Sequence, residues 1–271
     1  IIHNLKNIQK LINQTGLVRA NEEFFKWLQG EKTMPFGKNN EHIPIKLIDF
    51  NNFFKNSYII TNQFKVQFNE LKIPDIVLYV NGIPIVVGEV KTPIRPAISW
   101  LDGAHEIHDI YENSIPQLFV PNILSFATEG KELFYGAVRN PLQYWSPWRI
   151  NDNDNLEKKL GLGEIKDELI DLLSPERLLD ILKNFSLFTT NKKKQRSKVI
   201  CRFQQYEGAN KIVERVIEGK EKKGLIWHFQ GSGKSLLMVF AAQKLRKLAE
   251  LKSPTVLVLV DRTDLDTQIS G

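Results

Sequence analysis

The stretch PDIVLYVNGIPIVVGEVKTP, from Pro74 to Pro93, predicts the fold of the first part of the chain. Two apolar runs flank Asn81-Gly82, a dipeptide typical of the turn in a β-hairpin. The second run is apolar at nearly every position, which is typical of a strand that is buried on both faces. We therefore expect an α/β fold, in which a mixed sheet is flanked by helices.

Charged residues stand at the open end of this hairpin. Asp75 precedes the first run, and Glu89 and Lys91 end the second. Carboxylate oxygens suit Mg²⁺, which lowers the pKa of a bound water and stabilises charge on a phosphate. A lysine beside such an ion can neutralise developing negative charge. We interpret Asp75 and Glu89 as metal ligands, and all three residues as the catalytic set of a nuclease. The alternative is a strand cap at Asp75 and a solvated edge at Glu89 and Lys91.

The register of the hairpin tests this interpretation. Glu89 and Lys91 are two residues apart, so both side chains emerge on one face of a strand. A two-residue loop without a bulge would set Asp75 opposite Gly88 and turn Glu89 to the other face. Asp75 and Glu89 share a face only if the loop has an odd length or the hairpin contains a β-bulge. We predict one of these two features.

A second motif, GSGKS, runs from Gly231 to Ser235 between a strand-like run and a helical run. Its glycines let backbone N–H groups turn toward phosphate, and the helix N-terminus adds positive potential. We expect Gly231, Ser232 and Gly233 to form a loop around the phosphates of ATP. Lys234 would contact these phosphates, and Ser235 would ligate Mg²⁺.

Residues outside this motif refine the predicted ATP site. His228 stands where the strict pattern has glycine, a variation that occurs in helicase-like motors. Gln205 lies upstream at the distance expected of an adenine-recognising segment, where it would pair with the adenine edge while Tyr206 stacks on its face. The competing interpretation is a helix that exposes a glutamine.

Apolar spacing and polar breaks divide the chain into three parts, at residues 1–150, 151–198 and 199–271. The middle part contains a basic run at residues 191–198. The spacing predicts helices over residues 2–28 and 105–111, and two more within 163–185 that are separated by Pro175. It predicts strands over residues 43–50, 58–68, 119–130, 132–138, 224–228 and 255–261.

Composition limits the possible partners and compartments. The 271 residues carry a net charge of +6, which is compatible with a polyanionic partner. The single cysteine, Cys201, excludes an internal disulfide and fits a reducing, cytoplasmic setting. No apolar run approaches the roughly 20 residues that cross a bilayer, so we expect no membrane association. The chain begins with Ile1, and few residues follow the last predicted strand, so we interpret it as a fragment of a longer protein.

Several blocks resemble the restriction (HsdR-type, motor) subunit of type I restriction–modification enzymes, in that family's order. They are FFKWLQGEKT, IKLIDFNN, NSYIITNQFKVQF, the hairpin, IPQLFVPN, GLIWHFQGSGKSLLM and VLVLVDRTDLDTQ. The resemblance implies a PD-(D/E)XK endonuclease domain at residues 1–150. It implies a helical linker at 151–198 and part of a RecA-like, superfamily 2 helicase domain at 199–271.

The resemblance also implies an activity. Members of this family cut double-stranded DNA with Mg²⁺, use ATP to translocate DNA, and act with methyltransferase and specificity subunits. The family often has a glutamine four residues before a tyrosine on the helix that follows the triad. If Tyr111 is that tyrosine, Ile107 takes the place of the glutamine.

Two other functions stay open at this stage. One is a stand-alone superfamily 2 helicase–nuclease of DNA repair, which would have no methyltransferase partner. The other is a nuclease fold that serves only as a DNA-binding or docking module, although the intact acidic and basic set argues against it. His105, His108 and one of Glu22 and Glu23 could also approach the metal, but they are not part of the predicted site.

Overall fold

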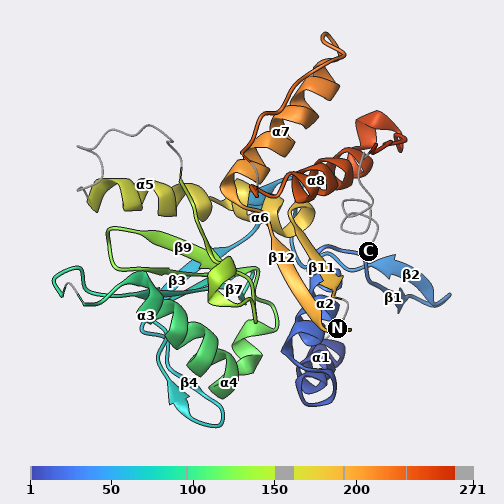
Figure 1. Cartoon of the computed structure of the whole chain (residues 1–271). Coiled ribbons are helices and arrows are strands. Elements are labelled where there is room, and N and C mark those ends of the chain that lie inside the picture. Colours follow the sequence, from blue (N-terminus) through green and yellow to red (C-terminus); the bar gives the residue numbers. More distant parts are fainter. Residues whose placement is uncertain (1, 96, 150–161, 192, 230, 260–271) are drawn as a thin grey trace. The chain divides into compact units, whose positions relative to one another are not determined.

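The computed structural model describes residues 2–95, 97–149, 162–191, 193–229 and 231–259. The chain divides into two compact units, residues 1–200 and residues 201–271. We refer to them as the N-terminal unit and the C-terminal unit and describe each by itself (Figure 1). The three-part division expected from the sequence stays a prediction.

The core of the N-terminal unit is a six-stranded mixed sheet with the order β10-β9-β8-β7-β6-β3. Strands β7 and β8 are parallel, and all other neighbours are antiparallel. The strands are β3 (Tyr58–Asn62), β6 (Ile76–Val80), β7 (Ile83–Val90), β8 (Leu124–Thr128), β9 (Leu133–Gly136) and β10 (Ser146–Pro147). The mixed sheet with flanking helices confirms the predicted fold class at this level.

Strand β7 lies in the interior of this sheet, between β6 and β8. Its residues from Ile85 to Glu89 are all buried, so the prediction of a strand covered on both faces is confirmed. Two charged residues, Glu89 and Lys91, therefore lie where a buried strand ends.

The helices of the N-terminal unit flank this sheet. They are α1 (Ile2–Thr15), α2 (Leu17–Leu28), α3 (Trp100–His105), α4 (Glu112–Ser114), α5 (Leu162–Leu172) and α6 (Pro175–Asn184). A left-handed Gly16, with φ of 85°, separates α1 from α2, so the predicted helix over residues 2–28 is in two pieces. The two helices predicted around Pro175 are confirmed as α5 and α6.

The helix predicted at residues 105–111 is present, but its form differs from the expectation. It begins in α3, where Ser99 and Asp102 form a capping box. It continues as a π-helical turn, η2 (Glu106–Tyr111), and then as α4. A Cβ on Gly103 would lie 3.1 Å from the Glu89 Cβ and 3.3 Å from the Ala127 Cβ, so glycine lets α3 lie close against β7 and β8.

Four strand predictions were too long, and the run at 132–138 contains only β9 (Leu133–Gly136). The run at 43–50 contributes only to β2 (Glu41–Pro44), which pairs with β1 (Thr33–Phe36), because the Asp49 carboxylate accepts two backbone N–H groups and forms a turn. The run at 58–68 is interrupted after β3, where Gln63 has φ of 49°. In the run at 119–130, only residues 124–128 are a strand, because the 3₁₀ turn η3 (Pro116–Phe119) is followed by irregular backbone up to residue 123.

Two further hairpins complete the N-terminal unit. Strands β4 (Val66–Gln67) and β5 (Leu71–Lys72) form one, and β11 (Ser186–Thr190) and β12 (Arg196–Ile200) form the other. The second hairpin includes most of the basic run at residues 191–198, which the sequence assigned to a linker.

The C-terminal unit contains α7 (Phe203–Glu218), α8 (Lys234–Lys247) and the 3₁₀ turn η6 (Ala249–Leu251). The predicted helix after the GSGKS motif is confirmed as α8. The strand predictions at 224–228 and 255–259 are wrong, and residues 260–261 lie outside the described ranges. Apolar strands need hydrogen-bonded neighbours and covered faces. In the described part of this unit the two runs have no hydrogen-bonded neighbouring strand, and their side chains Leu225, Trp227 and Leu259 are exposed.

No helix among the described residues is long and apolar enough to span a membrane.

Candidate active site

A β-bulge in the β6–β7 hairpin sets the geometry of the site. Val80 pairs with Ile83 across the two-residue turn, and Ile76 pairs with Gly88 near the open end. The register shifts by one residue between these pairs, because Ile85 has no partner on β6. The predicted odd loop or bulge is therefore confirmed in the form of a bulge. The bulge shifts the register so that Glu89, the residue after Gly88, lies beside Asp75, the residue before β6.

Asp75, Glu89 and Lys91 meet at this end of the sheet. The backbone N–H of Asp75 donates to Glu89 Oε1 at 3.2 Å, and the backbone N–H of Val90 donates to Asp75 Oδ2 at 3.0 Å. Lys91 Nζ donates to Glu89 Oε2 at 3.1 Å. The three residues that the sequence predicted as one set are thus brought together by the fold.

Burial and charge change the acid–base properties of this cluster. Burial, followed by the nearby Asp75 carboxylate, raises the pKa of Glu89 to about 7, and Lys91 offsets only part of this. Burial alone would lower the pKa of Lys91, but Glu106 and Glu89 outweigh it and raise that pKa above its ordinary value. Near neutral pH Glu89 is therefore protonated in part, which reduces its repulsion from Asp75.

This arrangement fits a divalent cation. In the described part of the chain, no three His, Cys, Asp or Glu side chains converge into a complete metal cage. Mg²⁺ does not need one, because it usually binds one or two carboxylates and keeps waters that bridge to phosphate oxygens. Asp75 and Glu89 supply two carboxylates at adjoining positions, and a cation would take the place of the proton on Glu89.

Two residues that the sequence did not assign to the site complete it. Lys91 Nζ forms an ion pair with Glu106, and Tyr111 Oη donates to Glu106 Oε1 at 2.9 Å. Burial and then the Glu89 charge raise the pKa of Tyr111, so its hydroxyl stays protonated and acts as a donor. The signal in the sequence was weak, because a glutamate five residues before a tyrosine lies on another face of a regular α-helix.

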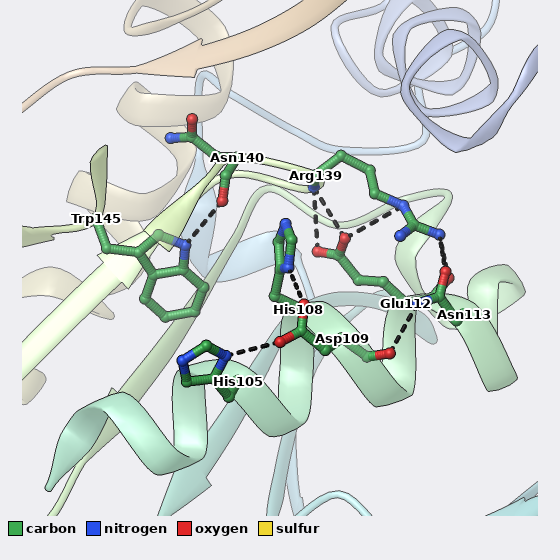
Figure 2. A network of polar contacts seen from close by, with 8 residues as sticks. All are labelled: His105, His108, Asp109, Glu112, Asn113, Arg139, Asn140 and Trp145. Atoms are coloured by element: carbon green, nitrogen blue, oxygen red, sulfur yellow. Dashed lines mark hydrogen bonds and ion pairs between the residues drawn. The ribbon is translucent and has the colours of Figure 1, made fainter. Parts of the chain in front are cut away.

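The histidines on this helix do not point into the site. Figure 2 shows His105 and His108 directed at Asp109, and their Nδ1 atoms lie 2.7 Å and 2.6 Å from its carboxylate. The two histidines line an open cavity of about 610 Å³ together with Trp100 and other residues. They are therefore not placed to bind a metal ion held by Asp75 and Glu89.

The early glutamates also have partners of their own. Glu22 forms an ion pair with Arg196, at 2.5 Å, and Glu23 forms ion pairs with Lys26 and Lys32. Neither is available as a metal ligand in this arrangement.

The GSGKS residues of the C-terminal unit form a separate candidate site. Gly231 and Gly233 have φ of 83° and 82°, a left-handed conformation that favours glycine. Lys234 and Ser235 begin α8. Lys234 Nζ donates to the carbonyl oxygens of His228 and Phe229, at 2.9 Å and 3.0 Å.

Gln205 lies against this loop, but it contacts protein atoms. Its Nε2 donates to the Gly233 carbonyl at 3.1 Å, and its Oε1 accepts from the Arg202 backbone N–H at 2.9 Å. It is buried, so the competing interpretation of an exposed glutamine is wrong. Ser232 Oγ and His228 Nδ1 are buried and have no hydrogen-bond partner in the described part of the chain. Two unsatisfied polar atoms beside a glycine loop and a lysine fit a triphosphate.

Both parts of the chain match known sequence families. Residues 1–144 match the type I restriction enzyme R protein N terminus (HSDR_N), and residues 204–271 match the SWI2/SNF2 ATPase family.

Relatives extend over nearly the whole chain. The chain is 34% identical over 263 residues to the type I restriction enzyme HindI endonuclease subunit of Haemophilus influenzae, a match that covers 93% of this chain and 25% of the relative. It is 30% identical over 273 residues to the putative MjaVIIIP endonuclease subunit of Methanocaldococcus jannaschii, covering 98% of this chain and 26% of the relative. The chain thus spans about a quarter of the length of these curated relatives.

Proposed function

The chain belongs to the type I restriction enzyme R-protein family, and on this premise we propose that it carries the site with which such an enzyme cuts double-stranded DNA. The observation that supports this proposal best is the bulged register of β6 and β7, which places Asp75 beside Glu89 and Lys91. In this proposal the N-terminal unit is a PD-(D/E)XK nuclease, and Asp75 and Glu89 hold Mg²⁺.

Each side chain has a distinct part in the proposed reaction. Bound Mg²⁺ would activate a water and stabilise negative charge on the scissile phosphate. Asp75 is fixed by the Val90 backbone N–H, which directs its carboxylate toward Glu89. Lys91 carries a positive charge at neutral pH, because its pKa is raised, so it can neutralise charge that develops on the phosphate. Burial of Glu89 excludes bulk water from one side of the site.

The C-terminal unit has a second part in this proposal. We place it in the first RecA-like lobe of a superfamily 2 motor, which is supported by the SWI2/SNF2 match and by the glycine loop at the start of α8. Lys234 and the loop residues Gly231, Ser232 and Gly233 would hold the phosphates of ATP. Ser235 would ligate Mg²⁺, and Gln205 would face the nucleotide once it leaves the loop carbonyls.

This function requires partners. The relatives are named endonuclease subunits, which implies an assembly. We propose methyltransferase and specificity subunits as partners, and ATP-driven translocation of DNA before cleavage.

Replacement of Asp75 tests the proposal. In the full subunit, assembled with its partners, Asp75→Ala is expected to reduce plasmid cleavage by about 100-fold or more, since one of two metal-binding carboxylates is lost. ATP hydrolysis should stay within about twofold of wild type, because Asp75 lies in the other compact unit. Cleavage is measured on a supercoiled plasmid, and ATP hydrolysis by release of phosphate.

Glu70→Ala is the matched control, because Glu70 is an exposed acid of the same region whose ion pair is to Lys72. It should leave both activities unchanged. Cleavage by Asp75→Ala at the wild-type rate would exclude the proposed site.

A further inference from the structure

We propose that Glu106 is a positioning residue for cleavage, which holds the Lys91 ammonium beside the Asp75–Glu89 pair, and that the π-helical turn η2 puts it there. This proposal rests on the proposed function and extends it to a residue outside the predicted set.

The contacts of Lys91 carry the proposal. Its ammonium lies between two carboxylates, Glu89 at 3.1 Å and Glu106 in a closer ion pair. Glu89 has a second task, because it faces Asp75 and is placed to bind the metal ion. Once Glu89 is engaged in this way, Glu106 is the carboxylate that still holds Lys91. A flexible lysine side chain is thereby kept in one place without weakening the metal site.

Glu106 is itself fixed at both oxygens. Its Oε2 atom contacts Lys91, and its Oε1 atom accepts the hydroxyl proton of Tyr111 at 2.9 Å. Tyr111 is buried, with 3% of its surface exposed, so its hydroxyl is a rigid anchor. The chain Tyr111–Glu106–Lys91–Glu89 thus links the helix to the end of β7.

The π-helical turn explains why a glutamate in this position reaches the site. The backbone N–H of Glu112 donates to the carbonyl oxygen of Ile107, five residues earlier, as in a π-helix. Glu106 and Tyr111 are also five residues apart, and this wider turn brings them onto one face. Ile107, four residues before Tyr111, is completely buried. A regular α-helix would have favoured position 107 over position 106.

The same contacts argue against a role for Glu106 as a metal ligand. Its described partners are Lys91 and Tyr111, and neither is an acid with which Glu106 could share a cation, whereas Glu89 lies beside Asp75. Moreover, the described residues contain no cluster of three potential ligands that includes it. Positioning of Lys91 and ligation of Mg²⁺ predict different kinetics, which separates them by experiment.

The test uses the full subunit in its assembled enzyme and compares Glu106→Ala and Glu106→Gln with wild type. Cleavage is measured at a series of Mg²⁺ concentrations. We expect Glu106→Ala to lower the maximal cleavage rate by about tenfold or more, since a misplaced group loses most of its contribution. Glu106→Gln should be affected less, because it keeps an acceptor for Lys91. The Mg²⁺ concentration for half-maximal cleavage should change by less than about twofold, because both ligands remain.

Asp109→Asn is the matched control. Asp109 is an acid of the same turn, but its partners are His105 and His108. It should cleave like wild type.

A double-mutant cycle supplies a readout that a purely structural role would not give. Tyr111→Phe removes only the hydroxyl that anchors Glu106, so it should lower the cleavage rate by about two- to fivefold. In the Glu106→Ala background the same change should have no further effect, because the anchored group is already absent. ATP hydrolysis should stay at the wild-type level in all of these variants.

Three results would overturn the positioning role. They are wild-type cleavage by Glu106→Ala, a rise of about fivefold or more in the Mg²⁺ requirement, and equal losses of cleavage and ATP hydrolysis in both Glu106 variants. The Asp75→Ala variant separates this failure from that of the proposed function. If Asp75→Ala does not cleave and Glu106→Ala cleaves normally, only the positioning role is excluded.

Discussion

At the scale of single residues, Glu112 is an acidic side chain that the fold buries. Its carboxylate is 1% exposed and accepts hydrogen bonds from the Arg139 backbone N–H, at 2.9 Å and 3.2 Å. The Arg139 guanidinium also lies beside it (Figure 2). Burial nevertheless raises the pKa of Glu112 to about 8, because the loss of hydration outweighs these contacts.

This pKa predicts how stability changes with pH. The unfolded chain releases the Glu112 proton near its ordinary value of 4.5, whereas the folded chain keeps it up to about 8. Between these values the contribution of Glu112 to the free energy of unfolding should fall as pH rises. Glu112→Gln cannot ionise, so its stability relative to wild type should increase by up to about 1.4 kcal/mol per pH unit.

Denaturant unfolding at pH 5, 6, 7 and 8 measures this difference. Glu176→Gln, at an exposed acid of α6, is the control and should follow the wild-type profile. A Glu112→Gln profile parallel to wild type would contradict the prediction.

Lys198 is a residue whose environment the sequence did not reveal. It belongs to the basic run at residues 191–198, yet its side chain is completely buried. Its Nζ donates to the carbonyl oxygens of Asn122 and Ile123, at 2.6 Å and 2.8 Å. Burial lowers its pKa well below the ordinary value. A run of lysines predicts side chains that are exposed to solvent or contact an anionic partner. Only the fold shows that Lys198 is instead buried and joins β12 to the segment before β8.

At the scale of elements, the parallel pair β7 and β8 depends on one glycine. Gly88 lies opposite Phe126, and a Cβ on Gly88 would lie 2.2 Å from the Phe126 ring. The ring therefore occupies the space that a side chain would need. This packing sets the position of β7 directly before Glu89.

Gly88→Ala should consequently lower the free energy of unfolding by about 1–3 kcal/mol, because the core is overpacked. Phe126→Leu alone should also destabilise the protein, since it leaves a cavity. The double variant should lose less than the sum of the two single losses, as the smaller side chain makes room for the added methyl group. Denaturant unfolding of the four proteins gives the coupling energy. Strict additivity would show that the Phe126 ring does not limit position 88.

At the scale of the whole molecule, two candidate sites lie in two compact units. The Asp75–Glu89 pair belongs to the N-terminal unit, and the loop at Lys234 belongs to the C-terminal unit. Each site is built from residues of its own unit alone. We therefore expect substitutions in one site to leave the binding properties of the other intact.

Lys234→Ala tests this division in the assembled enzyme. ATP hydrolysis should fall by about 100-fold or more, because the proposed contact of Lys234 to the phosphates is lost, and ATP-dependent cleavage should fall with it. Binding of Ca²⁺, an inert substitute for Mg²⁺ at the proposed Asp75 site, should stay unchanged in calorimetry. Lys220→Ala, at an exposed lysine of the same unit, is the control. Loss of Ca²⁺ binding in Lys234→Ala would show that the sites are not independent.

Much of the site could be predicted because its signals are local. An Asn-Gly turn between apolar runs specifies a hairpin, and the face alternation along a strand required a bulge or an odd loop, which the structure has at Ile85. The strands expected at 224–228 and 255–259 failed because an apolar run becomes a strand only beside a hydrogen-bonded partner. That condition is not contained in the run itself.

The sequence by itself determined which residues are chemically able to act, namely Asp75, Glu89, Lys91 and the GSGKS loop, and it determined the family to which they belong. The tertiary structure alone decided how they are supported. The π-helical turn that brings Glu106 to Lys91 and the burial that raises the pKa of Glu89 both depend on contacts between distant segments. Local patterns cannot encode such contacts, because the free energy of a buried charge depends on the surroundings that the whole fold supplies.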